Sequence, residues 1–253
     1  MSGHNKWSKV KRIKGPLDAK RGQLFTKLIK EITISARMGG GSPDGNPRLR
    51  TAITAAKNAS MPKDNIDRAI KRGTGEIEGA VIEELVYEGY GPGGVAVMVE
   101  TTTDNKNRTV QDLRNLFKSH GGNLGEGGSV SWMFTHYGQI VFEKAKYPED
   151  KVMEVALEIG AQDINEGGET VEVLTSVPDV YKVKEAFDNV GLHPASVGFT
   201  FVAKTAVPIQ KKEDAEKLLD FIESIEDHDD VQRVHANFEM DEKVVAELES
   251  KGA

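Results

Sequence analysis

The sequence contains no cysteine among its 253 residues. This absence excludes disulfides, thiolate zinc sites, iron–sulfur clusters and cysteine nucleophiles, and it is typical of a reducing compartment. No apolar run is long enough to cross a bilayer, and the residues that follow the first methionine are polar and basic rather than apolar. We therefore expect a cytoplasmic protein without membrane contact.

Motifs for catalysis and nucleotide binding are also missing. The six histidines have no metal-ligand spacing among themselves, and neither Gly-x-Ser-x-Gly nor His-Glu-x-x-His occurs. The glycine-rich segment 121–128 follows a predicted helix and precedes a predicted strand, the reverse of the order in a phosphate-binding turn. The acidic segment 226–230 around His228 could attract a divalent cation, but such segments are more often solvated loops. We predict no cofactor, no metal site and no enzymatic activity.

Positive charge is concentrated at the start of the chain. Residues 1–75 hold 17 Lys and Arg against 5 Asp and Glu, a net charge of +12, whereas the remaining residues hold 16 against 35, a net charge of −19. Such asymmetry is expected when one part of a chain binds a polyanion and the rest stays soluble. A basic helical surface without a partner would have the same composition, so charge alone leaves both interpretations open.

The basic part is predicted to form an arm followed by three helices. Residues 1–19 carry five basic side chains around Trp7, which could stack on a base or pack against the next domain. Apolar spacing, an Asn46-Pro47 cap and Pro62 define the helices. The helices are predicted over residues 20–38, 47–59 and 62–73, and their predicted core is Leu49, Ile53, Ile66 and Ile70.

The rest of the chain alternates between strand and helix patterns. The first predicted elements are strands over 84–90 and 95–101, a helix over 107–120 and a strand near 130–134. From residue 139 to residue 201 the predicted order is βαββαβ, the ferredoxin-like signature. The remaining helix over 211–225 and strand over 231–238 cannot form a core alone. We therefore expect them to complete the first sheet, with the βαββαβ domain inserted into it.

The predicted fold class is multidomain α+β, with a three-helix N-terminal module and two ferredoxin-like α/β domains, one inserted in the other. The predicted parts are an arm (1–19), a three-helix domain (20–78), a discontinuous α/β domain (79–134 and 205–253) and an inserted domain (135–204).

Long motifs throughout the chain resemble those of the YebC/PmpR family. They lie at residues 3–11, 21–29, 46–50, 61–66, 87–96, 103–109 and 121–129. The resemblance covers essentially the whole chain and implies a helical domain plus two α/β domains, one inserted in the other. It also implies a cytoplasmic regulator of transcription that binds promoter DNA. Related mitochondrial proteins activate translation of a cytochrome oxidase subunit, and bacterial members are linked to relief of ribosome stalling at proline-rich stretches.

Two roles on nucleic acid therefore stay open. No helix rich in Asn, Gln and Arg stands out in the sequence, and no dimer motif is evident, which favours ribosomal RNA and a monomer. Readout of DNA shape needs no such helix, so a DNA-binding transcriptional regulator remains the first interpretation. The alternative is a translation factor that binds ribosomal RNA on the ribosome. A third possibility, from another class, is a protein-interaction module whose acidic clefts bind a cationic partner.

The candidate nucleic-acid contacts are basic residues of the arm and of the helices, because such side chains neutralise phosphates. They are Lys6, Lys9, Lys11 and Arg12 in the arm and Lys27, Lys30, Arg37, Arg48, Arg50 and Lys57 on the helices.

Overall fold

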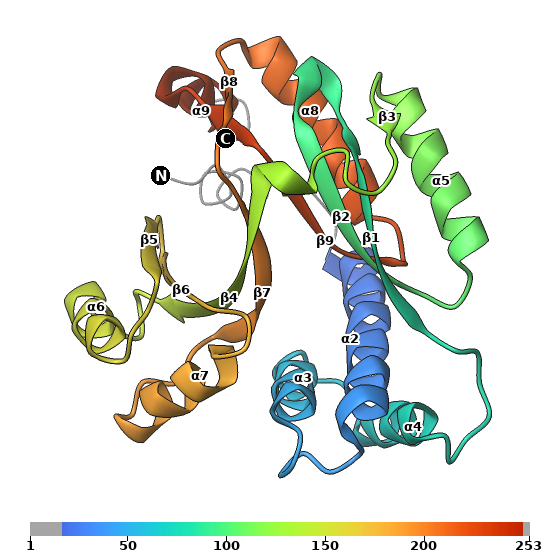
Figure 1. The fold of residues 1–253 in the computed structure, drawn as a ribbon, viewed down its shortest axis with the longest axis vertical. Helices are drawn as coiled ribbons and strands as arrows, with labels where there is room; N and C mark the ends of the chain where they lie inside the picture. The colour runs from blue at the N-terminus through green and yellow to red at the C-terminus, as the bar shows by residue number, and fades with distance from the viewer. Residues whose placement is uncertain (1–16, 250–253) are drawn as a thin grey trace. The chain divides into compact units, whose positions relative to one another are not determined.

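The computed structural model describes residues 17–249, which form two compact units (Figure 1). One unit holds residues 17–130 and 216–234, and the other holds residues 131–215 and 235–249. The domain boundaries predicted from the sequence divide the chain more finely and remain a prediction. Within residues 17–249, no helix combines the length and the apolar character that a membrane span requires.

Three helices open the first unit, as predicted: α2 (Leu17–Gly39), α3 (Pro47–Asn58) and α4 (Lys63–Thr74). The side-chain oxygen of Asn46 accepts a hydrogen bond from the backbone N–H of Leu49 at 3.1 Å, so α3 begins at the predicted cap. Leu49 and Ile66 are buried between the helices, and Ile53 and Ile70 pack against the same cluster. The predicted core of the module is confirmed.

Gly73 lets α4 lie directly against α2. A Cβ atom at position 73 would lie 2.3 Å from the carbonyl oxygen of Thr33 and 2.8 Å from the Cβ of Ala36. Both distances are below van der Waals contact, so a larger residue would push the two helices apart.

A four-stranded sheet follows in the same unit. Its strands are β1 (Glu83–Tyr90), β2 (Ala96–Thr103), β3 (Asn123–Leu124) and β9 (Val231–Ala236), in the order β3-β1-β2-β9. β9 thus joins β1 and β2 from far along the chain, as predicted. Two helices, α5 (Lys106–Ser119) and α8 (Lys212–Glu226), pack against each other. The rings of Phe117 and Phe221 meet there edge to face, with centroids 4.9 Å apart.

The strand predicted near residues 130–134 is wrong, because a 3-10 turn (Ser131–Met133) occupies this stretch. A buried carboxylate explains the difference. The backbone N–H groups of Gly128 and Val130 each donate to the side chain of Glu88 at 2.8 Å. These N–H groups bond to a side chain rather than to a neighbouring strand, so the segment leading into residue 131 is a loop.

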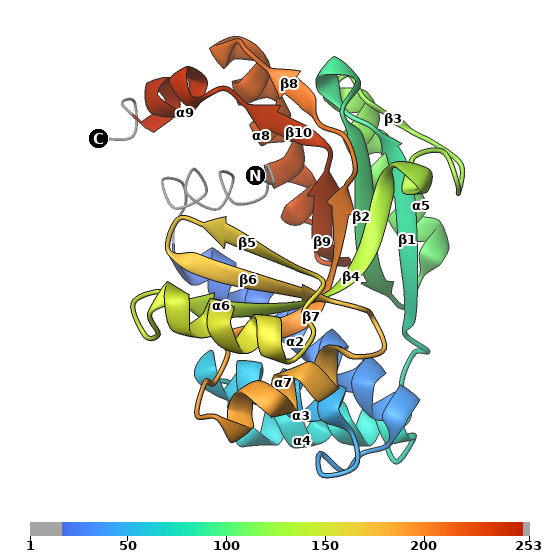
Figure 2. The same ribbon diagram turned by 60° about the vertical axis from the view of Figure 1, so that its left-hand side comes forward.

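The second unit contains the predicted βαββαβ domain. Its elements are β4 (Phe134–Glu143), α6 (Glu149–Glu158), β5 (Asp163–Gly167), β6 (Thr170–Thr175), α7 (Val180–Asn189) and β7 (Ser196–Ala203). The sheet order is β5-β6-β4-β7 and neighbouring strands are antiparallel, which is the ferredoxin-like arrangement. Helices α6 and α7 lie on one face of the sheet, over a core that includes Phe142 and Phe187 (Figure 2).

The two sheets share one plan. Each element of the first domain has an equivalent in the second: β2 corresponds to β4, α5 to α6, β3 to β5, β1 to β6, α8 to α7 and β9 to β7. With these pairs, the strand order β3-β1-β2-β9 matches the strand order β5-β6-β4-β7. The first domain is therefore a permuted ferredoxin-like fold, in which the strand equivalent to β6 comes first in the chain. This arrangement confirms the predicted fold class, and it makes α5 the counterpart of α6.

The strand predicted over 231–238 is in fact two strands. β9 ends at Ala236, and β10 (Phe238–Met240) pairs in parallel with β8 (Val207–Ile209) in a separate small sheet. Between them, the carbonyl oxygen of Asn237 accepts a hydrogen bond from the N–H of Val207 at 2.7 Å. The chain thus leaves one sheet and enters another within two residues, before helix α9 (Glu242–Glu249).

Candidate nucleic-acid interface

Helix α3 presents two predicted contacts, Arg50 and Lys57, on one side. The residues are seven positions apart, which places them on one face two turns from each other. Both are exposed, and α3 contains no acidic residue. Arg50 donates through Nη1 to the carbonyl oxygens of Pro43 and Asp44, at 3.2 and 3.4 Å, and so holds the loop before the helix. Lys57 forms no hydrogen bond or ion pair with any residue in the range 17–249.

Helix α4 adds further exposed positive charge, although with acids among it. The exposed cations of α4 are Lys63, Arg68, Lys71 and Arg72. Asp64 and Asp67 are exposed on the same helix, near its N-terminus, where the helix dipole favours negative charge. Together, α3 and α4 expose six cations against two carboxylates, a surface suited to a polyanion.

Lys27 and Lys30 of α2 lie in a different environment from Arg50 and Lys57. Lys27 Nζ donates to the carbonyl oxygen of Glu226 at 2.8 Å, and Lys30 Nζ donates to that of Asp229 at 2.8 Å. One turn before Lys27, the side-chain amide of Gln23 donates to the carbonyl oxygen of Asp227 at 3.1 Å. These donors bind the C-terminal end of α8, where carbonyl groups lack helical partners and the dipole favours cations.

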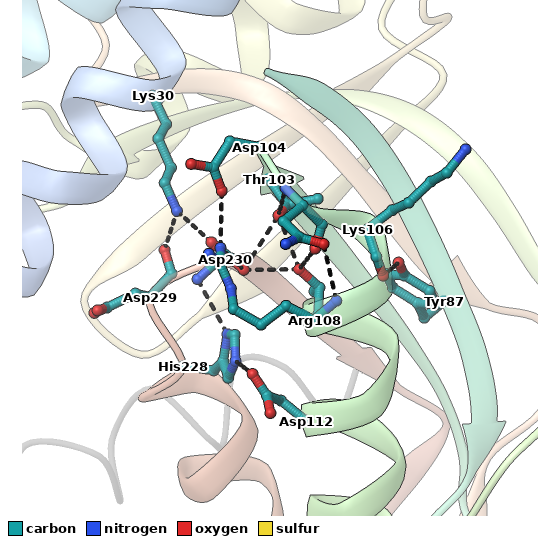
Figure 3. Close-up of polar contacts among 12 residues, drawn as sticks. Lys30, Tyr87, Thr103, Asp104, Lys106, Arg108, Asp112, His228, Asp229 and Asp230 are labelled. Atoms are coloured by element: carbon teal, nitrogen blue, oxygen red, sulfur yellow. Dashed lines mark hydrogen bonds and ion pairs between the residues drawn. The ribbon is translucent and has the colours of Figure 1, made fainter. Parts of the chain in front are cut away.

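Asp230 is the centre of this contact (Figure 3). Its side chain is 3% exposed and accepts hydrogen bonds from Lys30 Nζ at 2.7 Å and from Arg108 Nη2 at 3.0 Å. The hydroxyl groups of Thr109 and Thr103 donate to the same carboxylate at 2.7 and 3.2 Å. Asp230 therefore joins α2 to the start of α5.

Burial by itself would raise the pKa of Asp230. The hydrogen bonds from Lys30, Thr109 and Arg108 outweigh burial and hold that pKa well below its ordinary value. The carboxylate is thus ionised at neutral pH and attracts both cations.

His228 supports Asp230 from the same segment. Its Nδ1 accepts a hydrogen bond from the backbone N–H of Asp230 at 3.1 Å, and its Nε2 lies 3.3 Å from Oδ2 of Asp112 on α5. The sequence favoured a solvated loop at residues 226–230, which holds for the exposed Asp227 and Asp229 but is wrong for Asp230, because this carboxylate is buried against α2 and α5. Within the described part of the chain, no group of three or more His, Asp or Glu side chains is placed to hold a metal ion.

Arg37 and Arg48 also bind the protein itself. Arg37 donates through Nη1 to the carbonyl oxygen of Ile82 at 2.8 Å. Arg48 forms a two-pronged pair with Glu31 of α2, at 2.8 and 3.1 Å, and a second pair with Glu84 of β1. Burial alone would lower the pKa of Arg48. The hydrogen bonds and charges of Glu31 and Glu84 outweigh burial and hold that pKa above its ordinary value.

Of the six predicted helical contacts, Arg37, Arg50 and Lys57 are exposed, whereas Lys27, Lys30 and Arg48 are half-buried against partners within the chain. Arg37 and Arg50 each donate to backbone carbonyl groups, and Lys57 has no such partner among residues 17–249. Lys27, Lys30 and Arg48 would have to exchange these partners to reach a phosphate, and the role of all six residues as nucleic-acid contacts remains a prediction. The arm residues Lys6, Lys9, Lys11 and Arg12 lie outside the described residues.

Gln23 and Asp230 were not among the residues predicted from the sequence. A signal was present in the spacing, because Gln23, Lys27 and Lys30 recur at helical intervals and the end of α8 is acidic. Nothing in the sequence shows that these two segments meet, since they lie about 200 residues apart.

The fold and the surface together define a multidomain α+β protein whose helices α3 and α4 expose six cations. The sequence model of the TACO1/YebC N-terminal domain matches residues 5–76, and the model of the TACO1/YebC second and third domain matches residues 82–238. The chain belongs to this family.

Relatives extend the match over the whole chain. A probable transcriptional regulatory protein of Desulfotalea psychrophila is 53% identical over 248 residues, covering 98% of this chain and 99% of the relative. A protein of the same description from Geotalea uraniireducens is 53% identical over 243 residues, covering 96% and 98%. The crystal structure of a conserved hypothetical protein from Aquifex aeolicus superposes with a TM-score of 0.85 at 47% identity, covering 89% of this chain and 93% of that one. The names of the two sequence relatives support a regulatory role.

Proposed function

We propose that the protein is a DNA-binding regulator of transcription that acts by binding rather than by catalysis. The observation that carries this proposal is the exposed positive surface of α3 and α4, with Arg50 and Lys57 on a helix that has no acid. Cations in this arrangement neutralise phosphates with little dependence on base sequence. The relatives are described as probable transcriptional regulatory proteins, and because transcription is regulated on DNA, this description favours DNA over other polyanions.

Charge reversal of exposed cations tests the proposal directly. We expect the triple variant Arg50→Glu, Lys57→Glu, Arg68→Glu to bind random double-stranded DNA about 100-fold more weakly at 0.1 M salt, because each lost phosphate contact removes counterion release. The free energy of unfolding should change by no more than about 1 kcal/mol, since these side chains are on the surface. Fluorescence anisotropy across a salt series measures the affinity.

The control reverses three lysines outside the helical module, Lys151, Lys182 and Lys217, which changes the net charge equally. Equal losses in the two triple variants would mean that net charge, not this surface, determines binding. A wild-type protein that binds ribosomal RNA but not double-stranded DNA in the same buffer would replace the proposal by the translational role. Crosslinking in cells, with sequencing of both the DNA and the RNA recovered, makes the same distinction in vivo.

A further inference from the structure

The solvent-facing side of α5 has an unusual composition. Its exposed residues Asn107, Gln111, Arg114, Asn115 and Lys118 fall within about 100° of one another at the helical period of 100° per residue. The opposite side of α5 packs inward through residues such as Leu113 and Phe117. The face therefore carries amides and two cations and no acid.

These five side chains form no hydrogen bond or ion pair with any residue in the described range 17–249. The one acid of α5, Asp112, lies off this face, where it meets Nε2 of His228. The acid just before the helix, Asp104, pairs with Arg108 at 2.9 Å. Asp112 and Asp104 are thus engaged by histidine and by Arg108 rather than by Arg114 or Lys118.

Helices α6 and α8 do not share this composition. The counterpart of α5 in the inserted domain, α6, exposes Asp150, Lys151, Glu154 and Glu158. Helix α8 exposes Glu213, Asp214, Lys217 and Asp220. The two domains have the same topology, yet of the two equivalent helices only α5 has a solvent-facing side without acids. The helix position in the fold therefore does not explain the amide-rich face of α5.

We infer that the exposed face of α5 contacts base edges in the major groove of double-stranded DNA. Arg pairs with the O6 and N7 atoms of guanine, and Asn and Gln pair with the N6 and N7 atoms of adenine. The helix has 14 residues, about 21 Å at 1.5 Å per residue, and a B-form major groove admits an α-helix. This role rests on the proposed function, in which α3 and α4 hold the phosphates.

RNA fits this face less well. No aromatic residue lies among the five exposed side chains, and recognition of single strands depends on aromatic stacking. The major groove of an A-form RNA duplex is too narrow for side chains to read. Asp230 binds both Lys30 of α2 and Arg108 of α5, and it would hold these two helices together while DNA is bound.

Selection from a random pool of double-stranded DNA tests the inference with the full chain. The variant Gln111→Ala, Arg114→Ala, Asn115→Ala should lose at least about tenfold of the preference for the selected sequence over random DNA, because each two-pronged base contact contributes that order of discrimination. Its affinity for random DNA should fall by only a few fold. A second variant, Arg114→Lys, keeps the positive charge but loses the guanidinium group that makes two parallel hydrogen bonds. It should weaken the preference for guanine at the contacted position and leave the affinity for random DNA unchanged. Lys151→Ala on α6 removes one positive charge and should leave the preference intact.

The outcomes separate this inference from the proposed function. Wild-type protein that binds no double-stranded DNA would overturn both. The role of α5 alone would be overturned by a combination of two results. DNA binding would be lost on reversal of Arg50, Lys57 and Arg68, and the sequence preference would survive the α5 changes. Wild-type binding without any sequence preference would overturn the role of α5 too. Circular dichroism and thermal unfolding confirm that each variant is folded.

Discussion

Two sets of cations in the helical module differ in what surrounds them. On α2, Lys27 and Lys30 face the end of α8 and bind its carbonyl groups and Asp230. On α3, Arg50 and Lys57 face solvent, and no carboxylate is bound to either. The same residue types on neighbouring helices thus bind the end of α8 in one place and stay exposed to solvent in the other. The groups that surround each cation, carbonyl oxygens as well as carboxylates, determine how far its side chain is committed to the fold.

The largest effect is expected from removing the acidic partner of Lys30. Asp230→Ala would leave Lys30, 16% exposed, without its carboxylate and would remove the acceptor of two buried hydroxyl groups. Loss of one member of a buried pair typically costs about 3–5 kcal/mol of the free energy of unfolding. Urea unfolding followed by circular dichroism measures the change. The control is Asp229→Ala, because the exposed Asp229 contacts Lys30 through its backbone only. A variant at 230 that is as stable as the variant at 229 would contradict the central role of this carboxylate.

The pH dependence of stability should show part of the same effect. Since the pKa of Asp230 is lowered in the folded state, its contribution is complete above the ordinary value of 3.8 and is lost as the pH falls below it. The stability difference between wild type and Asp230→Asn should therefore be constant from pH 7 to pH 5 and should narrow toward pH 3. Unfolding curves at each pH provide the test. A difference that stays constant down to pH 3 would show that folding does not shift this pKa.

Local patterns predicted the helices well. A capping Asn46, prolines at helix starts and apolar residues at helical spacing act within a few residues of each other, so α3 and α4 begin within a residue of the predicted positions. The ferredoxin-like order also followed from the succession of elements. The 3-10 turn at 131–133 was missed because Glu88, which binds the preceding loop, lies about 40 residues earlier.

The roles of individual cations were not readable from the sequence for the same reason. A helical wheel places Lys27 and Lys30 on the basic side of α2, and it cannot show that the end of α8 covers that side. The expectation that no helix is rich in Asn, Gln and Arg is wrong for α5, whose helical wheel contains an amide-rich face. Only the packing of Phe117 against Phe221 shows that this face is left to solvent. Contacts between residues far apart in the sequence determine whether a cation is exposed. They therefore also determine whether it can bind a ligand or instead stabilises the fold.

The smallest expected effect comes from a matched pair of single changes, Lys27→Met and Lys57→Met, which remove the same charge and keep a similar side-chain length. Lys27→Met should lower the free energy of unfolding by about 0.5–1.5 kcal/mol, the usual net value of one hydrogen bond, because it leaves the carbonyl group of Glu226 without this donor. Lys57→Met should change the free energy of unfolding by less than about 0.5 kcal/mol.

In DNA binding the order of the two effects reverses. Lys57→Met should reduce the slope of log K against log salt by about 0.9, the value of one phosphate contact, while Lys27→Met leaves the slope unchanged.

Denaturant unfolding and salt-dependent anisotropy on the same two proteins measure both quantities. If Lys27→Met reduced the salt slope as much as Lys57→Met, with no loss of stability, the division between the two sets of cations would be wrong. Lys27 would then have to leave Glu226 to reach a phosphate when DNA binds. A slope that changes only for Lys57→Met would mean that the contacts of α2 persist in the complex and that the solvent-facing side of α3 meets the DNA.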